Sequence, residues 1–488
     1  MQSFFTILFL KPEYIMFELI HAGVTALNTV LYDFYIVPLF LIIAGIFLSV
    51  RLGFPQVRHF VEMLRVTRDK PLHAHGISSF GALMVSTASR VGTGNIVGVS
   101  TAICLGGAGA IFWMWFITVI GAASAFVEST LAQIYKRHDD VTGHSYGGPS
   151  YYIQTALGLR WLGILFSAFV LITYIVGYNL LASYNIQDSL SGYSFYDKDS
   201  TPVVIGIVLA VLFAACIWGG AKKITTITSY LVPIMGTIYV IVALGIIIYN
   251  ISNVPAMFAT IFKSAFSFDA GFGGFAGSCI MYGIKRGLYS NEAGMGSAPN
   301  ASASASVSHP VKQGLVQSLS VFIDTLLICS ATALMCLSCD VEPTKEISGI
   351  LYVQKSLTSV LGTHGAIFIT FSMCLFGYTT LIGNYYYTEG CLRFIMNKRP
   401  NNTIRNIFKA IATVIVFVGA ISSASFAWDS ADLCQGLMVL VNIPVILILS
   451  PIAIKALRNY IEQREKGLEP VYIAKECGVD QQTDYWIK

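Results

Sequence analysis

Long apolar segments separated by short polar gaps dominate this chain and limit what it can fold into. Of its 488 residues, 55% are hydrophobic and only 11% are charged, whereas an ordinary soluble domain carries roughly a quarter charged residues. Many of the segments reach the roughly 20 residues that a helix needs to cross a bilayer. The sequence therefore predicts an all-α polytopic membrane protein that lies in the lipid bilayer and does not bind nucleic acid.

The hydropathy pattern predicts eleven transmembrane helices, preceded by an amphipathic surface helix over residues 14–30. The eleven predicted spans are 32–50, 78–105, 109–135, 161–186, 202–218, 225–249, 256–284, 313–338, 364–391, 407–425 and 433–454. The first residues, MQSFFTILFLKPEY, lack the basic region and the cleavage site of a secretory signal peptide. We therefore do not interpret them as a leader.

The basic residues are distributed unevenly between the gaps. On this span count, 24 of the 30 Lys and Arg residues fall on one side of the membrane, together with the C-terminal tail. Cytoplasmic loops carry such an excess. The sequence therefore predicts a multi-pass protein of the cell (inner) membrane with its N-terminus outside and its C-terminus in the cytoplasm.

Without the first span, the other ten helices divide into two sets of five, which must enter the membrane from opposite sides. This is the inverted-repeat arrangement of many secondary transporters. The predicted divisions are 1–77 (surface helix, extra span and basic linker), 78–250 (first repeat), 251–455 (second repeat) and 456–488 (cytoplasmic tail).

Two glycine-dense stretches, GTGN at 92–95 and DAGFGGFAG at 269–277, lie in the first span of each half. Glycine destabilises a helix by roughly 1 kcal/mol relative to alanine, and an unwound segment frees backbone groups that hydrocarbon cannot satisfy. Half-helix N-termini attract a carboxylate, and freed carbonyls attract a cation. Two such interruptions predict a site for an amino acid with Na⁺. The alternative is close helix packing, since Gly94 and Gly98 match a GxxxG spacing. A dinucleotide fingerprint is excluded because no soluble βαβ unit surrounds the stretch.

Three segments resemble the alanine or glycine:cation symporter family, which is similar to sodium:alanine symporters and belongs to the amino acid–polyamine–cation transporter superfamily. They are GTGNIVGVSTAICLGGAGAIFWMW at 92–115, GGPSYYI at 147–153, and RGLYSNEAGMGSAPNA at 286–301, which is followed by HPVKQG and FIDT. The resemblance extends from about residue 40 to 455. It implies a leucine-transporter-type 5+5 fold in the last ten spans, and uptake of small neutral amino acids (alanine or glycine) coupled to Na⁺ or H⁺.

The resemblance and the two stretches together predict a substrate site. Gln187 resembles the substrate-facing glutamine of the family, although a polar residue near a span end is also typical of the membrane interface. The phenylalanines would form an apolar wall, and the glycines would offer backbone groups. The predicted substrate residues are Thr93, Gly94, Asn95, Gln187, Phe272, Gly274, Phe275, Gly277, Thr380 and Asn384.

The segment LFGYTTLIGNYYYTEG, in the span at 364–391, places Thr379 and Thr380 deep in the membrane. In the related fold a hydroxyl pair at this place binds Na⁺ together with carbonyls of the first broken helix, here Ala88 and Val91. The alternative for a span hydroxyl is a hydrogen bond to its own helix. Asn384 replaces the tryptophan expected of alanine-selective members, which predicts a roomier, more polar pocket that also admits glutamine.

Arg90 is a charged residue inside a predicted span, which requires a partner or an aqueous path. We predict that it belongs to the inner gate and pairs with Glu128, Glu292 or Asp324, or that it snorkels to the cytoplasmic interface. The segment 289–309 is rich in small and polar residues, and its composition alone is typical of a linker. The resemblance instead implies a helical segment near that gate.

The predicted mechanism is alternating access with Na⁺ as coupling ion and no cofactor. A proton-coupled carrier with Asp269 or Glu128 as the proton site is the main alternative. A channel would need polar stripes along several helices. An enzyme would need motifs such as HExxH or GxSxG, which the spans lack. The CxxC of Cys336 and Cys339 is not accompanied by a second ligand pair and is interpreted as core.

Overall fold

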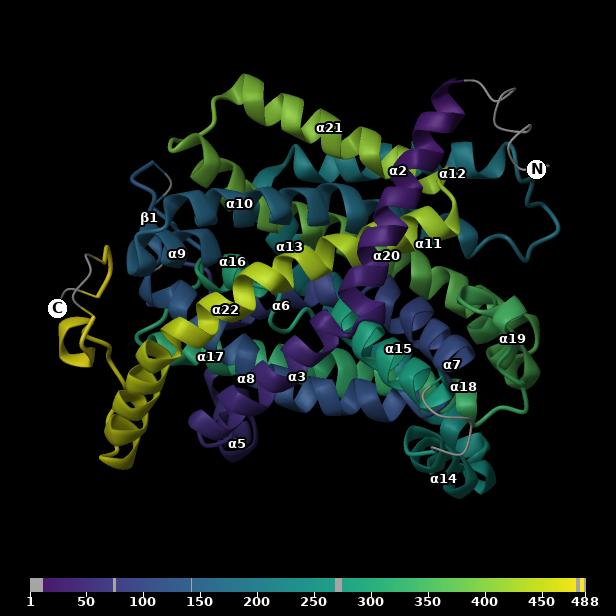
Figure 1. Cartoon of the computed structure of the whole chain (residues 1–488), viewed down its shortest axis with the longest axis horizontal. Helices are drawn as coiled ribbons and strands as arrows, with labels where there is room; N and C mark the ends of the chain where they lie inside the picture. Colours follow the sequence, from purple (N-terminus) through teal and green to yellow (C-terminus); the bar gives the residue numbers. More distant parts are fainter. Residues whose placement is uncertain (1–11, 73–75, 142, 268–273, 480–482, 487–488) are drawn as a thin grey trace.

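The computed structural model describes residues 12–72, 76–141, 143–267, 274–479 and 483–486, with the side chains of 12–17 and 274–277 left out. The described part is almost entirely helical (Figure 1). One antiparallel pair of short strands, β1 (Arg137–His138) and β2 (Ser145–Tyr146), joins Arg137 to Tyr146 and His138 to Ser145.

The first half of the chain contains a bent N-terminal helix, an interrupted helix and four further long helices. Its elements are α2 (Pro12–Asn28), η1 (Thr29–Asp33), α3 (Ile36–Arg51), α4 (Pro55–Arg58), α5 (Phe60–Val66), α6 (Ser79–Arg90), η2 (Gly94–Gly98), α7 (Val99–Gly106), α8 (Ala110–Ile134), α9 (Pro149–Leu157), α10 (Arg160–Leu171), η3 (Ile172–Gly177), α11 (Tyr178–Asp188), α12 (Thr201–Ile217) and α13 (Gly220–Tyr249).

The second half of the chain also begins with short or interrupted helices and continues with long ones. Its elements are η4 (Ile251–Asn253), α14 (Val254–Ala265), α15 (Gly274–Asn291), α16 (Ala298–Ser302), α17 (Pro310–Phe322), η5 (Ile323–Cys329), α18 (Ser330–Leu337), η6 (Lys345–Ile347), α19 (Ile350–Leu361), α20 (Thr363–Met396), α21 (Asn402–Ala420), α22 (Ala424–Glu465) and η7 (Lys475–Cys477).

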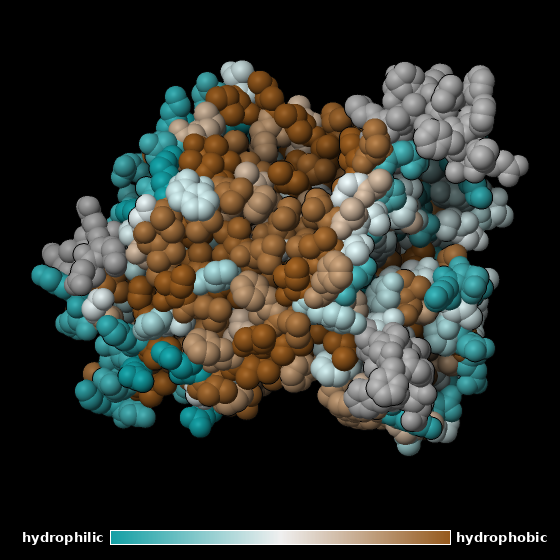
Figure 2. Space-filling model, viewed as in Figure 1, coloured by the Kyte–Doolittle hydropathy of each residue, from teal (hydrophilic) through white to brown (hydrophobic). Residues whose placement is uncertain are grey.

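Seven of the described helices are long and apolar enough to cross a membrane, or eight if the bent pair Glu18–Asp33 and Ile36–Leu52 forms one span. The multi-pass membrane character predicted from the sequence is thus confirmed. Exposed apolar side chains cover the surface that would face lipid. Val211, Ile241 and Val414, for example, are each more than half exposed. Figure 2 shows the resulting brown band between two hydrophilic ends.

Glycines allow the membrane helices to approach closely. A Cβ added at Gly314 would lie 2.3 Å from Thr130 of α8, and one at Gly383 would lie 2.8 Å from the backbone nitrogen of Ser89. Without a hydrophobic force between helices in lipid, such small-residue contacts are a main source of packing energy. The contact at Gly383 brings α20 directly against α6, where the first glycine-rich stretch begins.

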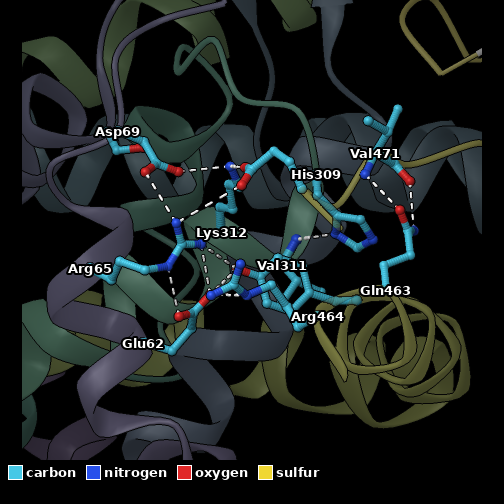
Figure 3. Close-up of polar contacts among 12 residues, drawn as sticks. Glu62, Arg65, Asp69, His309, Val311, Lys312, Gln463, Arg464 and Val471 are labelled. Atoms are coloured by element: carbon cyan, nitrogen blue, oxygen red, sulfur yellow. Dashed lines mark hydrogen bonds and ion pairs between the residues drawn. The ribbon is translucent and has the colours of Figure 1, made fainter. Parts of the chain in front are cut away.

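A polar network lies at the end of the molecule where α5 and the C-terminal segment meet (Figure 3). Glu62 of α5 accepts two hydrogen bonds from Arg65, both 2.8 Å, and one of 2.5 Å from the Tyr460 hydroxyl. Lys312 of α17 forms ion pairs with Asp69, at 2.7 Å, and with Glu469. These contacts tie three distant parts of the sequence together.

Candidate functional site

The first membrane helix of the repeat region is interrupted at Val91 and Gly92. Helix α6 ends at Arg90, and Val91 leaves the helical conformation with φ −74° and ψ 87°. The chain returns to helix at Thr93 and continues as the π-helix η2. The interruption therefore lies at the start of the glycine-rich stretch, one residue before the segment predicted from the sequence.

Gly92 is packed against Thr380 of α20. A Cβ added at Gly92 would lie 1.8 Å from Thr380 Oγ1, so no larger residue fits without a shift. Thr380 is 3% exposed, and its hydroxyl has no hydrogen-bond partner among the described residues. An unbonded hydroxyl in a buried site is unusual, and this one faces the interruption.

Thr379, the other hydroxyl of the predicted pair, is bonded within its own helix. Its Oγ1 donates to the carbonyls of Leu375, at 3.1 Å, and Phe376, at 2.9 Å. Ala88 and Val91 are buried beside α20. Of the two hydroxyls predicted to bind Na⁺, that of Thr380 is thus unbonded among the described residues. That of Thr379 instead bonds to its own helix, which was the alternative predicted from the sequence.

Asn95 connects the interruption to helices of the second half. Its Oδ1 accepts from the Gly92 backbone N–H at 2.7 Å, as a cap would, and its Nδ2 donates to Asp324 Oδ1 at 2.7 Å and Ser290 Oγ at 3.1 Å. Thr332 donates to the Asn95 carbonyl at 2.7 Å. The Asn95 side chain therefore stabilises the unwound backbone and joins it to α15 and η5.

Thr93 and Gly94 lie against Tyr289 of α15. The Thr93 and Tyr289 hydroxyls are 3.1 Å apart, and a Cβ added at Gly94 would lie 2.9 Å from the Tyr289 ring. Gly98 is less crowded, with its nearest such contact at 3.8 Å. The close-packing alternative for the glycines therefore applies to Gly94 more than to Gly98.

A second interruption lies between α15 and α16. Glu292, Gly294 and Gly296 have φ values of 54°, 86° and 82°, in a region that L side chains rarely adopt. Glycine relieves this strain at two of the three positions. The segment 289–309, read from composition as a linker and from resemblance as a helical segment, thus contains the second unwound stretch and packs against the first.

The sequence placed the second interruption at 269–277, of which 269–273 lie outside the described residues. Gly274, Phe275 and Gly277 belong to the first turn of α15, so their backbone groups are helical. Phe272 and Asp269 lie outside the described residues. The prediction for residues 269–273 therefore stays untested. The interruption at 292–296 was not predicted, because Glu292, which adopts the left-handed conformation, carries no glycine signal.

Asn384 belongs to a buried polar chain that crosses four elements. It donates to Asn179 Oδ1 of α11 at 3.0 Å and accepts from Ser89 of α6 at 2.8 Å. Ser89 also lies 3.2 Å from Glu292, whose other oxygen accepts from Ser297 at 2.7 Å. Ser89 and Asn179 were not predicted. Ser89 adjoins Ala88 and Arg90, which is the signal that could have found it, whereas Asn179 is a polar residue inside the predicted span 161–186.

Gln187 lies at the end of α11, where its Oε1 accepts from Tyr196 in the following loop at 2.8 Å. Its neighbour Ile186 packs against Gly377 of α20, which Thr93 also approaches. No hydrogen bond given for the described residues joins Gln187 to the first interruption, so the structure does not bring it together with Asn95.

Arg90 is 1% exposed and lies at the end of α6. Its Nη1 is 3.3 Å from Gln317 Oε1 of α17, whereas Nε and Nη2 have no hydrogen-bond partner in the part of the chain that the structure describes. It interacts electrostatically with Glu128, Glu292 and Asp324. It forms no ion pair with any of these three described residues, so the predicted gate salt bridge is not formed here.

The other acidic groups beside Arg90 are bonded to polar side chains. Glu128 Oε2 accepts from Asn442 of α22 at 2.8 Å, and Glu128 Oε1 is unbonded among the described residues. Asp324 Oδ2 accepts from Ser290 at 2.7 Å and from Thr325 at 2.8 Å. The structure therefore surrounds two unwound stretches with a charged, buried network.

Comparison with known proteins shows the family of this chain. Residues 17–474 match the profile of the Sodium:alanine symporter family. The chain is 44% identical to the "Amino-acid carrier protein AlsT" of Bacillus subtilis, over 93% of this chain and 95% of that protein. It is 43% identical to the "Probable sodium/glutamine symporter GlnT" of the same organism, over 88% of each. It is 37% identical to the "Sodium/proton-dependent alanine carrier protein" of Bacillus sp. PS3, over 86% of this chain and 96% of that protein.

Proposed function

Because this chain belongs to the sodium:alanine symporter family, we infer that it couples Na⁺ entry to the uptake of small neutral amino acids of the alanine and glutamine type. It is a membrane transporter and not an enzyme, and Na⁺ is its coupling ion. Transport by alternating access would let the two interrupted helices face each side of the membrane in turn.

The unbonded hydroxyl of Thr380 is the observation that carries the proposed ion site. Na⁺ in such folds is coordinated by the carbonyls of an unwound helix together with hydroxyls. Thr380 Oγ1 faces Gly92 at the point where α6 ends, and Ala88 and Val91 belong to the same turn. We propose that these three residues bind Na⁺, with Thr379 joining after its hydroxyl turns away from the Leu375 and Phe376 carbonyls.

The substrate site is proposed at the meeting of the two interruptions. An amino acid carboxylate is attracted to the freed N–H groups near Thr93 and Gly94, since the helix resumes at Thr93 and continues as η2. Asn95 and the polar chain through Asn384 line the same region. The proposed participation of Gln187, Phe272, Gly274, Phe275 and Gly277 rests on the resemblance and stays a prediction.

Eleven spans in an inverted repeat are supported by the way the two halves pack. Helices at corresponding places contact each other: α7 packs on α15, α8 on α17, α11 on α20, and α12 on α21. Contacts between counterparts are expected around a pseudo-two-fold axis. We propose repeats over 78–250 and 251–455, with α6–α7 and α15–α16 as the two interrupted helices, and with 1–77 and 456–488 outside the repeats.

The orientation is proposed from charge. Arg65, Lys136 and Lys312 lie at the same end of the molecule as the C-terminal segment, and the positive-inside rule puts that end in the cytoplasm. The N-terminus is then outside and the cell membrane is the location.

Proton coupling is the second candidate, and Glu128 is the observation that favours it. This carboxyl is fully buried, and one of its oxygens is unbonded among the described residues. A buried carboxyl group that faces a transport path is a common proton site. Uptake that persists without Na⁺ and collapses with a protonophore would assign the coupling to H⁺.

A competition assay in proteoliposomes tests the substrate assignment. Labelled alanine uptake is driven by a Na⁺ gradient while unlabelled amino acids are added in excess, with K⁺ in place of Na⁺ as control. Glutamine should compete and should itself be carried, because Asn384 stands where alanine-selective members are expected to have tryptophan. If glutamine neither inhibits alanine uptake nor is carried, the prediction of an enlarged pocket is wrong. If no amino acid is taken up in response to the Na⁺ gradient, the proposed function itself is wrong.

A further inference from the structure

A basic cavity lies at the end of the molecule that carries the C-terminal segment, away from the interruptions. Its volume is about 270 Å³, and its lining contains four cations, Arg137, Arg160, Arg393 and Lys398, and no carboxylate. These residues come from β1, the start of α10 and the end of α20. The fold therefore gathers positive charge from three distant parts of the sequence around one hollow.

Two of these cations are neutralised from outside the cavity. Arg137 pairs with Asp484 at 2.7 Å, and Arg393 pairs with Asp139 at 3.0 Å. The guanidinium of Arg393 also lies 3.8 Å from the centre of the Tyr146 ring. These pairs hold the walls of the cavity in place.

The other two cations retain their charge uncompensated. Arg160 donates to Gln154 Oε1 at 3.0 Å, Asn397 Oδ1 at 3.2 Å and the Phe394 carbonyl at 3.3 Å, all uncharged acceptors. Lys398 is exposed, and within the described residues neither cation has an ion-pair partner. A partly enclosed pair of uncompensated cations attracts an anion.

The cavity lies at the membrane boundary. Candidate spans Ala110–Ile134, Arg160–Asp188 and Thr363–Met396 all end beside it. Trp161, next to Arg160, is 63% exposed, and tryptophan is enriched at the level of lipid headgroups. From there the exposed side chains Leu165 and Ile172 continue along the lipid-facing side of the same membrane span.

We propose that this cavity binds the phosphate group of an anionic phospholipid, with Arg160 and Lys398 as the recognising cations. The acyl chains would follow the apolar surface that begins at Trp161, and a headgroup seated here would link the ends of α10 and α20. A water molecule takes about 30 Å³ of liquid, so the cavity has room for a phosphodiester and its glycerol.

Lipid titration of the full-length purified protein tests this proposal. In neutral detergent, dioctanoyl phosphatidylglycerol should raise the thermal unfolding midpoint in a saturable way, and dioctanoyl phosphatidylcholine should not. Each basic residue near a membrane surface contributes about fivefold to anionic lipid binding. The apparent Kd of the double variant Arg160→Gln, Lys398→Gln should therefore rise about 25-fold.

Two control variants make the result decisive. Lys466→Gln removes an exposed cation far along the tail and should leave the Kd unchanged. Arg160→Lys keeps the charge and should retain most of the binding, which separates recognition from a loss of local structure. The proposal is overturned if the double variant binds phosphatidylglycerol like the wild type, or if inorganic phosphate alone reproduces the whole shift.

Discussion

At Thr380, a buried hydroxyl with no hydrogen-bond partner among the described residues lies against the backbone of Gly92. Sequence reasoning selected Thr379 and Thr380 as a pair because the resemblance implies a Na⁺-binding hydroxyl pair at this place in the fold. It could not distinguish them, since the difference depends on rotation of each hydroxyl toward or away from its own helix. The same limit applies to Arg90, whose neighbours are set by the packing of α6 against α17.

Replacing Thr380 tests the ion site at the level of one oxygen atom. Thr380→Val removes the hydroxyl with little change in shape, and the Na⁺ concentration for half-maximal uptake should rise about tenfold or more, equivalent to about 1.4 kcal/mol or more. Thr380→Ser should restore it. A Na⁺ dependence unchanged in Thr380→Val would remove this residue from the site.

Gly92→Ala tests the close approach of α6 and α20. The new methyl group would meet the Thr380 hydroxyl at 1.8 Å, so the helices must separate, and Na⁺-driven uptake should fall at least tenfold while the protein still reaches the membrane. Gly245→Ala is the matched control because nothing lies within 4 Å of its added Cβ. Equal activity of the two variants would contradict the packing described here.

At the level of elements, the sequence predicted most helices and the first interruption, but it did not predict the interruption that follows α15. Gly92 and Gly94 predicted the first interruption because glycine destabilises helices. The second interruption runs through Glu292, which adopts a positive φ that only its surroundings can impose. The C-terminal segment was likewise expected to be a simple tail, yet Trp486 is buried and donates to the Gln133 carbonyl of α8 at 2.8 Å.

Trp486→Ala tests whether the C-terminal segment is part of the folded structure. The ring also packs on Tyr472 and lies 5.0 Å from the Lys136 ammonium. Its loss should destabilise the protein by about 3 kcal/mol and expose residues 468–486 to protease. Leu468→Ala, at a side chain 54% exposed, should change neither measurement. Unaltered protease resistance in Trp486→Ala would show that the segment is held by other contacts.

The network around Glu62 predicts a pH dependence. Burial opposes ionisation of Glu62, but hydrogen bonds from Arg65 and Tyr460 overcome it and lower its pKa to about 2. A carboxyl whose pKa is depressed on folding stabilises the protein above its unfolded pKa of about 4.5 and loses this contribution as the pH falls toward 2.

Thermal unfolding of Glu62→Gln against wild type measures this contribution. The whole pKa shift would correspond to about 3.4 kcal/mol, and solvent screening at this partly exposed site reduces that value. At pH 7 the variant should therefore be less stable by about 2 kcal/mol, and the difference should shrink steadily between pH 4.5 and pH 2. Glu465→Gln, at an exposed carboxyl near the end of α22, should show no such convergence. A difference that does not depend on pH would mean that Glu62 acts through packing and not through its charge.

At the scale of the whole molecule, composition and charge predicted a multi-pass membrane protein, and the family shows that it is a Na⁺-coupled transporter. Which residues meet at the interface between the two halves could not be predicted from the sequence. Contacts such as Asn95 with Asp324, or Asn384 with Asn179, join residues more than 200 positions apart. Such pairings depend on how the helices are arranged in space, and a hydropathy pattern does not give that arrangement.

Na⁺ entry drives amino acid accumulation by this transporter. One Na⁺ moving through 100 mV releases about 2.3 kcal/mol, and a tenfold gradient adds about 1.4 kcal/mol. Together they sustain a substrate gradient of roughly 500-fold for one Na⁺ per substrate.

The most direct measurement is the steady-state ratio of labelled alanine inside and outside proteoliposomes, recorded while the Na⁺ gradient and the membrane potential are varied independently. The account predicts a ratio that rises with both and collapses when K⁺ replaces Na⁺. A ratio that stays near one, or that follows an imposed proton gradient in the absence of Na⁺, would contradict it.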